Sequence, residues 1–480
     1  MLKSQIVIIG AGIIGSMISR ELSKYHLDVL VIDKENDVGN KTTNANSAIV
    51  HSGYDPVPGT LKAKFNVLGN SMFDELCEQL DVSFQRIGSL TVAIYDEQLP
   101  LLKELAERSK QNGVDVKILT PEEVKAMEPN INPEVKGAIF APTAGIVDPF
   151  NLCVHAMENA IDNGVRFERN CKVLDIQKDG DLFKISTSKG DIFAEIVINC
   201  AGVYSDKIAS LIEGIDWSIK PRKGEYFILD HFKKGFVNHT IFPLPSEKGK
   251  GILVSPTSSE NYILGPTSEE ILSREDLSTD KPTLDMVRKG AIDMVPTIPF
   301  NQVIRVFSGL RATCTRHDFV IEHSKKYKEF INVGGIESPG LVSSPAIAKY
   351  VVEELVLPIC PANKKSNYNP SVKKYLKLAK SLENNDLSLL KTNPDYSDVI
   401  CNCEKVTLGE INDILSRSCP PVSVKGVKRR TRAGFGKCQG GFCQPRIVLL
   451  LAKHYGVSPL DIPLDNEGSN ILVERIKETN

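Results

Sequence analysis

The chain has 480 residues, enough for two or three domains of ordinary size. Its 58 basic and 60 acidic residues nearly balance, which argues against a general attraction to nucleic acid or to an anionic membrane. No stretch approaches 18 consecutive apolar residues, so we expect no membrane span. The chain also enters its first predicted strand directly, so we expect no signal peptide. Scattered cysteines outside the C-terminal region indicate free thiols and a cytoplasmic location.

A nucleotide-binding pattern occupies the N-terminus. Residues 6–9 form an apolar run typical of a strand buried on both faces of a parallel sheet. Gly10, Gly12 and Gly15 follow at G-x-G-x-x-G spacing, then a helical apolar period and a second strand that ends at Asp33. Strand, glycine turn, helix, strand and carboxylate together predict a dinucleotide site.

Each part of this pattern has a physical role. Gly10 permits a tight turn, Gly12 leaves room for a pyrophosphate, and Gly15 lets the helix pack closely on the strand. The helix N-terminus offers free N–H groups and partial positive charge to the phosphates. The carboxylate of Asp33 can accept both hydroxyls of an adenosine ribose.

A small, polar segment at residues 39–54 is predicted to be a loop at the sheet edge. Its hydroxyls, among them those of Thr42, Thr43 and Ser47, can bind a second phosphate and the polar part of a flavin. His51 is the only histidine of this loop. From the residues alone, it is either a catalytic base or a packed or surface histidine.

The middle of the chain alternates between segments that resemble the N-terminal nucleotide-binding pattern and segments typical of an antiparallel sheet. Residues 60–130 are predicted to be mainly helical, and residues 171–194 a meander of short strands. An apolar strand at 196–202 is expected either to lie beside the first strand, bringing Gly202 near the dinucleotide, or to be a plain core strand. Residues 219–300 alternate between apolar and polar residues and predict an antiparallel sheet over the substrate.

The segments at 307–311 and 330–335 again resemble the strands of the first, nucleotide-binding part of the chain. We expect a helix from Pro345 to Leu355, capped by Ser344, whose N-terminus could face the flavin pyrimidine. The polar segment 361–398 is predicted to be a surface linker with one helix near 372–382.

Four cysteines near the C-terminus form a C-x-C … C-x4-C set: Cys401, Cys403, Cys438 and Cys443. Four thiolates suit either zinc or a [2Fe–2S] cluster. Nearby glycines, which free backbone N–H groups for sulfur, favour the cluster, as do basic residues that would stabilise its negative charge. The rival interpretation is a zinc ribbon that binds nucleic acid. Cys419 lies outside the pattern and is expected to be structural.

Several motifs together resemble those of the D-amino-acid-oxidase superfamily of FAD enzymes. Over about residues 1–360, the chain looks most like the glycerol-3-phosphate dehydrogenases and oxidases of that superfamily. The motifs are Ser47 to Asp55, Gly145 to Pro149, Ala201 to Ser205, Pro221 to Tyr226, Gly309 to Arg311 and Gly335 to Gly340. The run from Thr431 to Cys443 resembles the bacterioferritin-associated-ferredoxin-like domain, which ends the large subunit of anaerobic glycerol-3-phosphate dehydrogenases.

The resemblance implies roles for individual residues. His51 would take the substrate hydroxyl proton, and Arg311 would anchor the substrate anion; the alternative for Arg311 is a surface salt bridge. Independently of the resemblance, Lys250 (or its neighbour Lys248) is expected either to add a second charge to a phosphate or to be exposed to solvent. The expected FAD contacts are Gly10, Gly12, Gly15, Asp33, Thr42, Thr43, Ser47, Val173, Gly202, Gly335, Gly340 and Leu341. The expected cluster ligands are the four cysteines of the C-terminal set.

The expected fold is α/β: a Rossmann-like FAD-binding domain with an antiparallel-sheet substrate domain (α+β), and a small helical four-cysteine iron–sulfur domain at the C-terminus. The FAD-binding part would comprise about 1–85, 145–218 and 300–360, and the substrate part about 86–144 and 219–299. A linker at 361–398, a cluster domain at 399–456 and a tail at 457–480 would follow.

The expected function is oxidation of sn-glycerol 3-phosphate to dihydroxyacetone phosphate, with electrons passing through the cluster to a second redox protein. No nucleic-acid partner is expected, and any membrane association would be peripheral and through a partner. Three alternatives remain: a dehydrogenase of 2-hydroxyglutarate or another 2-hydroxy acid, an amine or amino-acid oxidase, and a flavin-containing redox-responsive binding protein.

Overall fold

The computed structural model describes residues 2–245 and 251–474. An eight-stranded sheet forms the centre of the first domain, in the order β10-β11-β12-β1-β2-β9, with β20 paired to β12 and β19 to β20. Its strands are β1 (Leu2–Ile9), β2 (Val29–Ile32), β9 (Arg166–Glu168), β10 (Val173–Asp179), β11 (Leu182–Thr187), β12 (Gly190–Asn199), β19 (Val320–His323) and β20 (Phe330–Gly334). β12 runs parallel to β1, so the predicted return of the chain beside its first strand is confirmed.

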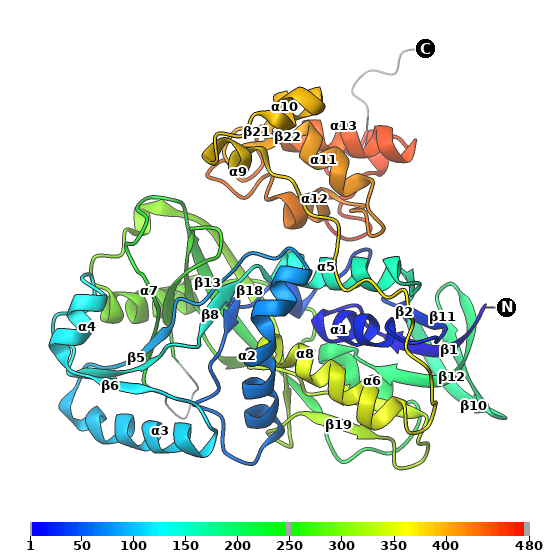
Figure 1. Ribbon diagram of the computed structural model, residues 1–480, viewed down its shortest axis with the longest axis horizontal. Helices are drawn as coiled ribbons and strands as arrows, with labels where there is room; N and C mark the ends of the chain where they lie inside the picture. The colour runs from blue at the N-terminus through cyan, green and yellow to red at the C-terminus, as the bar shows by residue number, and fades with distance from the viewer. Residues whose placement is uncertain (1, 246–250, 475–480) are drawn as a thin grey trace.

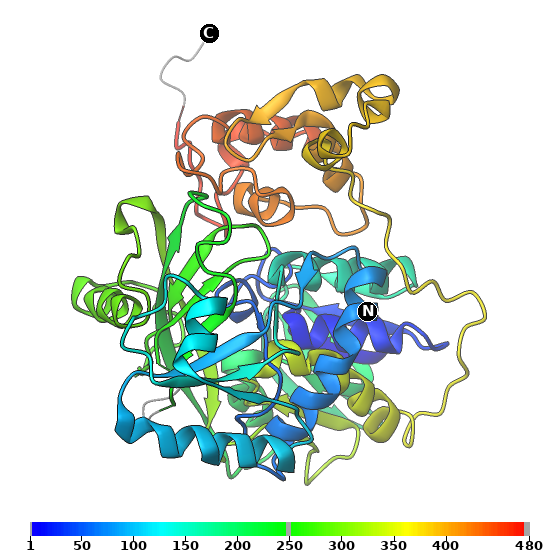
Figure 2. The same cartoon turned by 60° about the vertical axis from the view of Figure 1, so that its left-hand side comes forward.

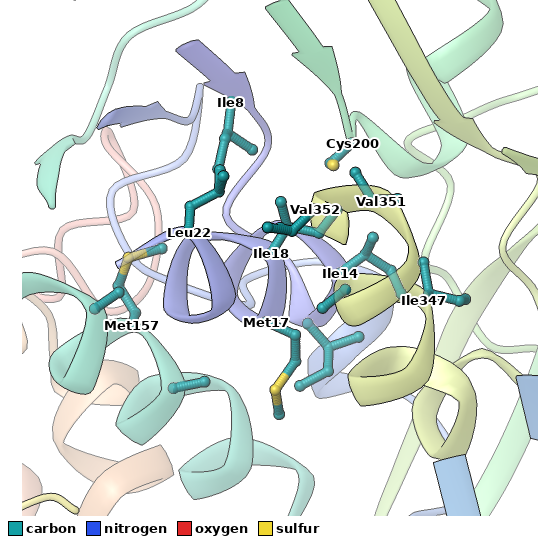
Figure 3. Close-up of a cluster of buried hydrophobic side chains, with 14 of the residues drawn as sticks. Ile8, Ile14, Met17, Ile18, Leu22, Met157, Cys200, Ile347, Val351 and Val352 are labelled. Carbon is teal, nitrogen blue, oxygen red and sulfur yellow. The ribbon is translucent and has the colours of Figure 1, made fainter. Parts of the chain in front are cut away.

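Helix α1 (Ile13–Leu22) connects β1 to β2 and is buried along its whole length. It packs between α5 (Pro149–Asp162) and α8 (Gly340–Tyr350), which continues into the π-helical turn η5 (Val351–Val356). Figure 3 shows Ile14 and Ile18 facing Ile347 and Val352 across this contact. Removing apolar surface from water stabilises the fold by about 25 cal/mol per Å². The packing of α1 therefore holds the glycine turn before it against the sheet.

The predicted start of α8 is wrong. The helix begins at Gly340, and Pro345 lies inside it rather than in its first turn. Pro345 cannot donate to the carbonyl of Leu341, four residues earlier. The hydroxyl of Ser344 donates to that carbonyl at 2.8 Å instead. Ser344 therefore replaces a missing backbone hydrogen bond and does not cap the helix.

A nine-stranded sheet forms the second domain, in the order β17-β13-β16-β15-β14-β5-β7-β6, with β18 paired to β13. Its strands are β5 (Ser89–Ala93), β6 (Lys117–Leu119), β7 (Gly137–Ala141), β13 (Ile219–Leu229), β14 (Thr240–Pro243), β15 (Leu253–Pro256), β16 (Tyr262–Gly265), β17 (Glu269–Glu270) and β18 (Val303–Cys314). Every pair is antiparallel except β14 and β5, so the sheet is mixed.

Strand β18 departs from the predicted division of the chain. Residues 300–360 were expected in the FAD-binding part, but β18 pairs with β13 along the whole length of that strand. Its apolar residues suit either sheet, and only the pairing decides between them. A small sheet of β3 (Ile49–Val50), β8 (Gly145–Val147) and β4 (Phe84–Gln85) joins the domains.

Helices cover the outer faces of both domains (Figure 1): α2 (Leu61–Gln79), α3 (Leu99–Gln111), α4 (Pro121–Met127), α6 (Ser205–Ala209) and α7 (Lys281–Met294). None of the helices in the described residues is long and apolar enough to cross a membrane.

The C-terminal domain lies on the first domain, above α5 (Figure 1). The chain reaches it through an extended segment along the surface (Figure 2). Two short helices, in place of the one predicted near 372–382, lead into it: α9 (Leu378–Glu383) and α10 (Ser388–Thr392). The domain contains β21 (Val399–Cys401), β22 (Val406–Thr407), α11 (Leu408–Leu415), α12 (Val424–Thr431) and α13 (Gln444–Tyr455) around its own apolar core.

Candidate active site

A cavity of about 1650 Å³ lies between the two large sheets. One end is lined by the glycine turn after β1, with Gly10 and Gly12, and by Asp33 at the end of β2. The other end is lined by strands β13 and β18 of the second sheet. The cavity therefore connects the predicted nucleotide site to the predicted substrate site.

The glycine turn has the geometry of a phosphate cradle. A Cβ atom on Gly10 would lie 2.4 Å from the carbonyl oxygen of Cys200, and one on Gly15 would lie 1.9 Å from the carbonyl oxygen of Gly10. Gly12 is the N-cap of α1 and has no side-chain cap, while the next N–H, of Ile13, donates to the Thr43 hydroxyl at 3.0 Å. This helix N-terminus fits a pyrophosphate. Gly15 does not line the cavity and serves the helix packing.

Asp33 lies half-buried on the cavity wall. Its carboxylate accepts hydrogen bonds from the N–H groups of Ala11 at 2.6 Å and Glu35 at 2.9 Å. Burial raises the pKa of Asp33 to about 6, because it outweighs the lowering by these two hydrogen bonds. Ribose hydroxyls, which donate to the ionised form, would relieve this cost.

The loop predicted at residues 39–54 forms a side wall of the cavity. Thr42 donates to the Leu310 carbonyl at 2.8 Å, and the Ser47 hydroxyl lies 3.4 Å from that of Tyr226. The cavity is also lined by the other expected flavin contacts Thr43, Val173, Gly202, Gly340 and Leu341. Gly335 does not line it; its φ of +67° places it in a turn behind the wall, where a Cβ would meet Cys314.

His51 lines the cavity from the same loop. Its backbone carbonyl accepts hydrogen bonds from the side chains of Asn66 at 2.7 Å and Asn70 at 2.9 Å, so its position is fixed by α2. Its Nε2 lies 3.5 Å from the Ser338 hydroxyl, and its ring lies 5.8 Å from that of Phe242. A histidine held this way can move a proton within the cavity.

Arg311 on β18 points into the cavity from the second sheet. Its Nη2 donates to the Thr267 carbonyl at 3.1 Å, whereas its Nη1 is buried and has no hydrogen-bond partner among the described residues. A buried, unpaired guanidinium N–H is costly, and an anion would satisfy it. Lys250 and Lys248 lie outside the described residues.

Three further cavity residues were not predicted as site residues: Arg222, Tyr226 and Thr267. Arg222 and Tyr226 belong to a motif that supported the resemblance. Alternation along one strand could have placed both side chains on the same face. Nothing local pointed to Thr267, because it contributes a backbone carbonyl.

The four predicted ligand cysteines come together as two pairs. The sulfur atoms of Cys403 and Cys438 are 3.7 Å apart, and the thiol of Cys443 hydrogen-bonds to Cys401. Within residues 2–245 and 251–474, no three His, Cys, Asp or Glu side chains surround a single point as ligands of one ion. Two pairs are the arrangement expected when each iron of a [2Fe–2S] cluster holds two thiolates.

Backbone N–H groups surround these sulfur atoms, as the glycine content predicted. Cys438 accepts hydrogen bonds from Gly440, Gly441 and Phe442, which help to lower its pKa against the effect of burial. Cys401 accepts from the N–H of Gly434, and this bond adds to that from Cys443 in lowering its pKa. Such donors stabilise thiolates and cluster sulfur. The donor set therefore fits the cluster.

Three basic residues of this domain do not serve as predicted. Arg430 and Arg429 bind Asp37 of the first domain, and Arg417 binds Glu158 of α5. Their acidic partners lie in distant parts of the chain, so the charges of the C-terminal segment alone could not reveal these ion pairs. These cations fix the domain interface rather than surround the cluster. Cys419 is fully buried beside Arg430, consistent with the structural role expected for it.

Residues 5–354 match the protein family described as FAD dependent oxidoreductase. The chain belongs to this family. It is therefore an FAD-dependent oxidoreductase, and the glycine cradle, Asp33 and the polar loop fit the cofactor. Residues 399–453 match the BFD-like [2Fe-2S] binding domain, so the protein carries both FAD and a [2Fe–2S] cluster.

This flavoprotein has relatives that share most of its length. It is 45% identical over 471 residues to a glycerol 3-phosphate dehydrogenase from Caloramator mitchellensis, covering 97% of this chain and 98% of the relative. It is 33% identical to a glycerol 3-phosphate oxidase from Mycoplasma genitalium, covering 76% of this chain and 97% of the relative.

The flavoprotein is also similar to a solved structure, L-alpha-glycerophosphate oxidase from Mycoplasma pneumoniae, reduced with dithionite and with FAD bound. The TM-score is 0.74 at 29% sequence identity, covering 78% of this chain and 99% of that one. The predicted family, fold class and cofactors are confirmed by these matches together.

Proposed function

We propose that this flavoprotein oxidises sn-glycerol 3-phosphate to dihydroxyacetone phosphate and passes the electrons through its [2Fe–2S] cluster to a second redox protein. The observation that carries the proposal is the position of Arg311 Nη1 in the same cavity as His51. This atom is buried and has no hydrogen-bond partner among the described residues. A substrate with an anionic group and a secondary alcohol would meet both side chains. The names of the relatives from Caloramator and Mycoplasma support this substrate.

The residues divide the reaction between them. Arg311 binds the phosphate and so orients the alcohol carbon toward the flavin end of the cavity. His51, in its neutral form, takes the hydroxyl proton at Nε2, and Ser338 orients the ring. FAD, when bound, supplies the hydride acceptor. In this proposal Cys401, Cys403, Cys438 and Cys443 hold the cluster.

Electron transfer to a partner is supported by the exposure of the cluster site. Cys403 is exposed and Cys438 is half-buried, while Phe442, which lies between Cys438 and Cys443 in the sequence, is 82% exposed. An exposed aromatic side chain beside a redox centre is typical of a protein–protein contact. None of the eleven cysteines forms a disulfide, and the proposal includes a cytoplasmic location.

Stopped-flow mixing of the anaerobic holoenzyme with a substrate panel tests the proposal. We expect glycerol 3-phosphate to bleach the visible flavin band and to yield dihydroxyacetone phosphate. Relatives named L-2-hydroxyglutarate dehydrogenase, such as one from Arabidopsis thaliana at 28% identity over 73% of this chain, make 2-hydroxyglutarate the main comparison. Faster bleaching by 2-hydroxyglutarate or by an amino acid than by glycerol 3-phosphate would overturn the proposed substrate. Failure of every substrate would favour a binding protein.

A further inference from the structure

Strands β13 and β18 place two arginines opposite each other at the substrate end of the cavity. Arg222 pairs with Arg311 in the antiparallel register, and Gly224 pairs with Gly309. Directly opposed residues project from the same face of a sheet, with Cβ atoms about 4.5–5.5 Å apart. Arg222 and Arg311 both line the cavity, so their guanidinium groups share one region of it.

Gly224 provides the seat for the Arg311 guanidinium. A Cβ atom at Gly224 would lie 2.8 Å from Arg311 Nη2 and 2.9 Å from the Thr267 carbonyl oxygen. Nη2 of the guanidinium therefore lies directly beside the glycine, held by its 3.1 Å hydrogen bond to the Thr267 carbonyl. Its Nη1 remains buried without a partner among the described residues and is available to a ligand.

Arg222 also keeps its charge available. Among the described residues it forms no ion pair within 4 Å, although it is partly buried. The nearby carboxylate of Glu337 already has partners, since it accepts from Lys62 at 2.8 Å and from Thr313 at 2.6 Å.

The acidic residues of the neighbouring strand β17 are also partly committed. Glu270, which lies opposite Arg222, pairs with Lys220 at 3.4 Å. Glu269 lines the cavity opposite Lys223, and Lys223 in turn pairs with Asp276 at 3.3 Å. Two basic residues of β13 and β18, Arg222 and Arg311, thus line this region, and neither forms an ion pair within 4 Å among the described residues.

We propose that Arg222 and Arg311 form a two-guanidinium clamp that selects a dianionic phosphate group over a single carboxylate. This inference rests on the proposed function and specifies how the substrate is chosen. A phosphate monoester carries close to two negative charges near pH 7, because its second pKa is about 6. One guanidinium can bind a carboxylate through two parallel hydrogen bonds, whereas a phosphate offers a third oxygen and a further charge to a second guanidinium.

Equilibrium binding of inorganic phosphate and of acetate to the oxidised holoenzyme tests the clamp without turnover. Both ligands can be followed by the perturbation of the flavin spectrum. Arg222→Gln is expected to weaken phosphate binding at least about tenfold, roughly the effect of one charge-assisted hydrogen bond. It should change acetate binding less than about twofold. Arg222→Lys should retain part of the phosphate affinity, because it keeps the charge but not the planar fork.

Lys220→Gln is the matched control, because it removes one positive charge two residues away on the same strand. Lys220 does not line the cavity, so phosphate affinity should stay within about twofold of the wild type. The clamp is overturned if Arg222→Gln weakens phosphate and acetate equally, or if Lys220→Gln matches it. The clamp and the proposed reaction can fail separately. If Arg222→Gln selectively loses phosphate binding but glycerol 3-phosphate does not reduce the flavin of the wild type, the clamp is supported and the proposed reaction is contradicted.

Discussion

Asp37 and Arg430 form a bidentate ion pair that joins the FAD-binding domain to the cluster domain. The two N–O distances are 2.7 and 2.8 Å, and the side chains are 0% and 2% exposed. Burial raises the pKa of Asp37, but Arg430 and Arg429 outweigh it and hold that pKa well below its usual range. Asp37 follows the end of β2, so this pair fixes α12 close to the nucleotide end of the cavity.

Arg430→Met is expected to destabilise the protein by about 3–5 kcal/mol, because it leaves the buried carboxylate of Asp37 without its main partner. The double variant Asp37→Leu, Arg430→Met should regain most of this loss, since no buried charge remains. Denaturant unfolding measures both. Arg166→Met, which breaks an exposed pair with Asp28, should cost less than about 1 kcal/mol. Equal effects of the buried and exposed variants would contradict the interpretation.

FAD affinity is expected to rise with pH through about 6 and to level off above it. In the apoprotein the raised pKa keeps Asp33 protonated below that pH, whereas ribose hydroxyls donate to the ionised carboxylate. FAD binding therefore releases a proton in this window. Fluorescence titration of the apoprotein at several pH values measures the effect. Asp33→Asn should bind more weakly and without this pH dependence; an unchanged slope in this variant would assign the proton to another group.

Gly224→Ala is expected to raise KM for glycerol 3-phosphate at least about tenfold, equivalent to about 1.4 kcal/mol of binding. The new methyl group would lie 2.8 Å from Arg311 Nη2 and displace the guanidinium. FAD content should not change. Gly214→Ala is the control, because a Cβ there meets nothing within 4 Å. Steady-state kinetics of both variants measure KM. A normal KM in Gly224→Ala would argue against a role of Gly224 in positioning the Arg311 guanidinium.

His51→Asn is expected to lower kcat by about 10² to 10⁴, the usual contribution of a positioned general base. KM should change little, because Asn66 and Asn70 hold the backbone of residue 51 rather than its side chain. The rate of flavin bleaching in a single turnover measures the loss directly. His454→Asn, at an exposed position on α13, should behave like the wild type. A bleaching rate within threefold of the wild type in His51→Asn would remove His51 from the reaction.

Local patterns predicted the nucleotide half of the site because its parts lie close together in sequence. Gly10, Gly12 and Asp33 line the cavity as expected, and β12 lies beside β1. The cysteine spacing likewise predicted the C-terminal [2Fe–2S] domain that the family match confirms.

Features that depend on distant partners could not be predicted. The strand containing Arg311 has an apolar pattern that suits either sheet, and its pairing with β13 is set by tertiary packing. The ion pair between Asp37 and Arg430 joins residues nearly 400 positions apart. The start of α8 was misplaced because the hydrogen bond from Ser344 compensates for Pro345 inside the helix.

We expect electrons from the substrate to pass from FAD to the cluster. The most direct test is one anaerobic turnover with glycerol 3-phosphate, in which electron paramagnetic resonance follows the cluster while absorption follows the flavin. We predict that flavin bleaching precedes the signal of the reduced cluster in the wild type and in Cys419→Ser. In Cys438→Ser we predict bleaching at the same rate with no cluster signal. A wild-type protein whose flavin bleaches while the cluster stays oxidised would contradict the account.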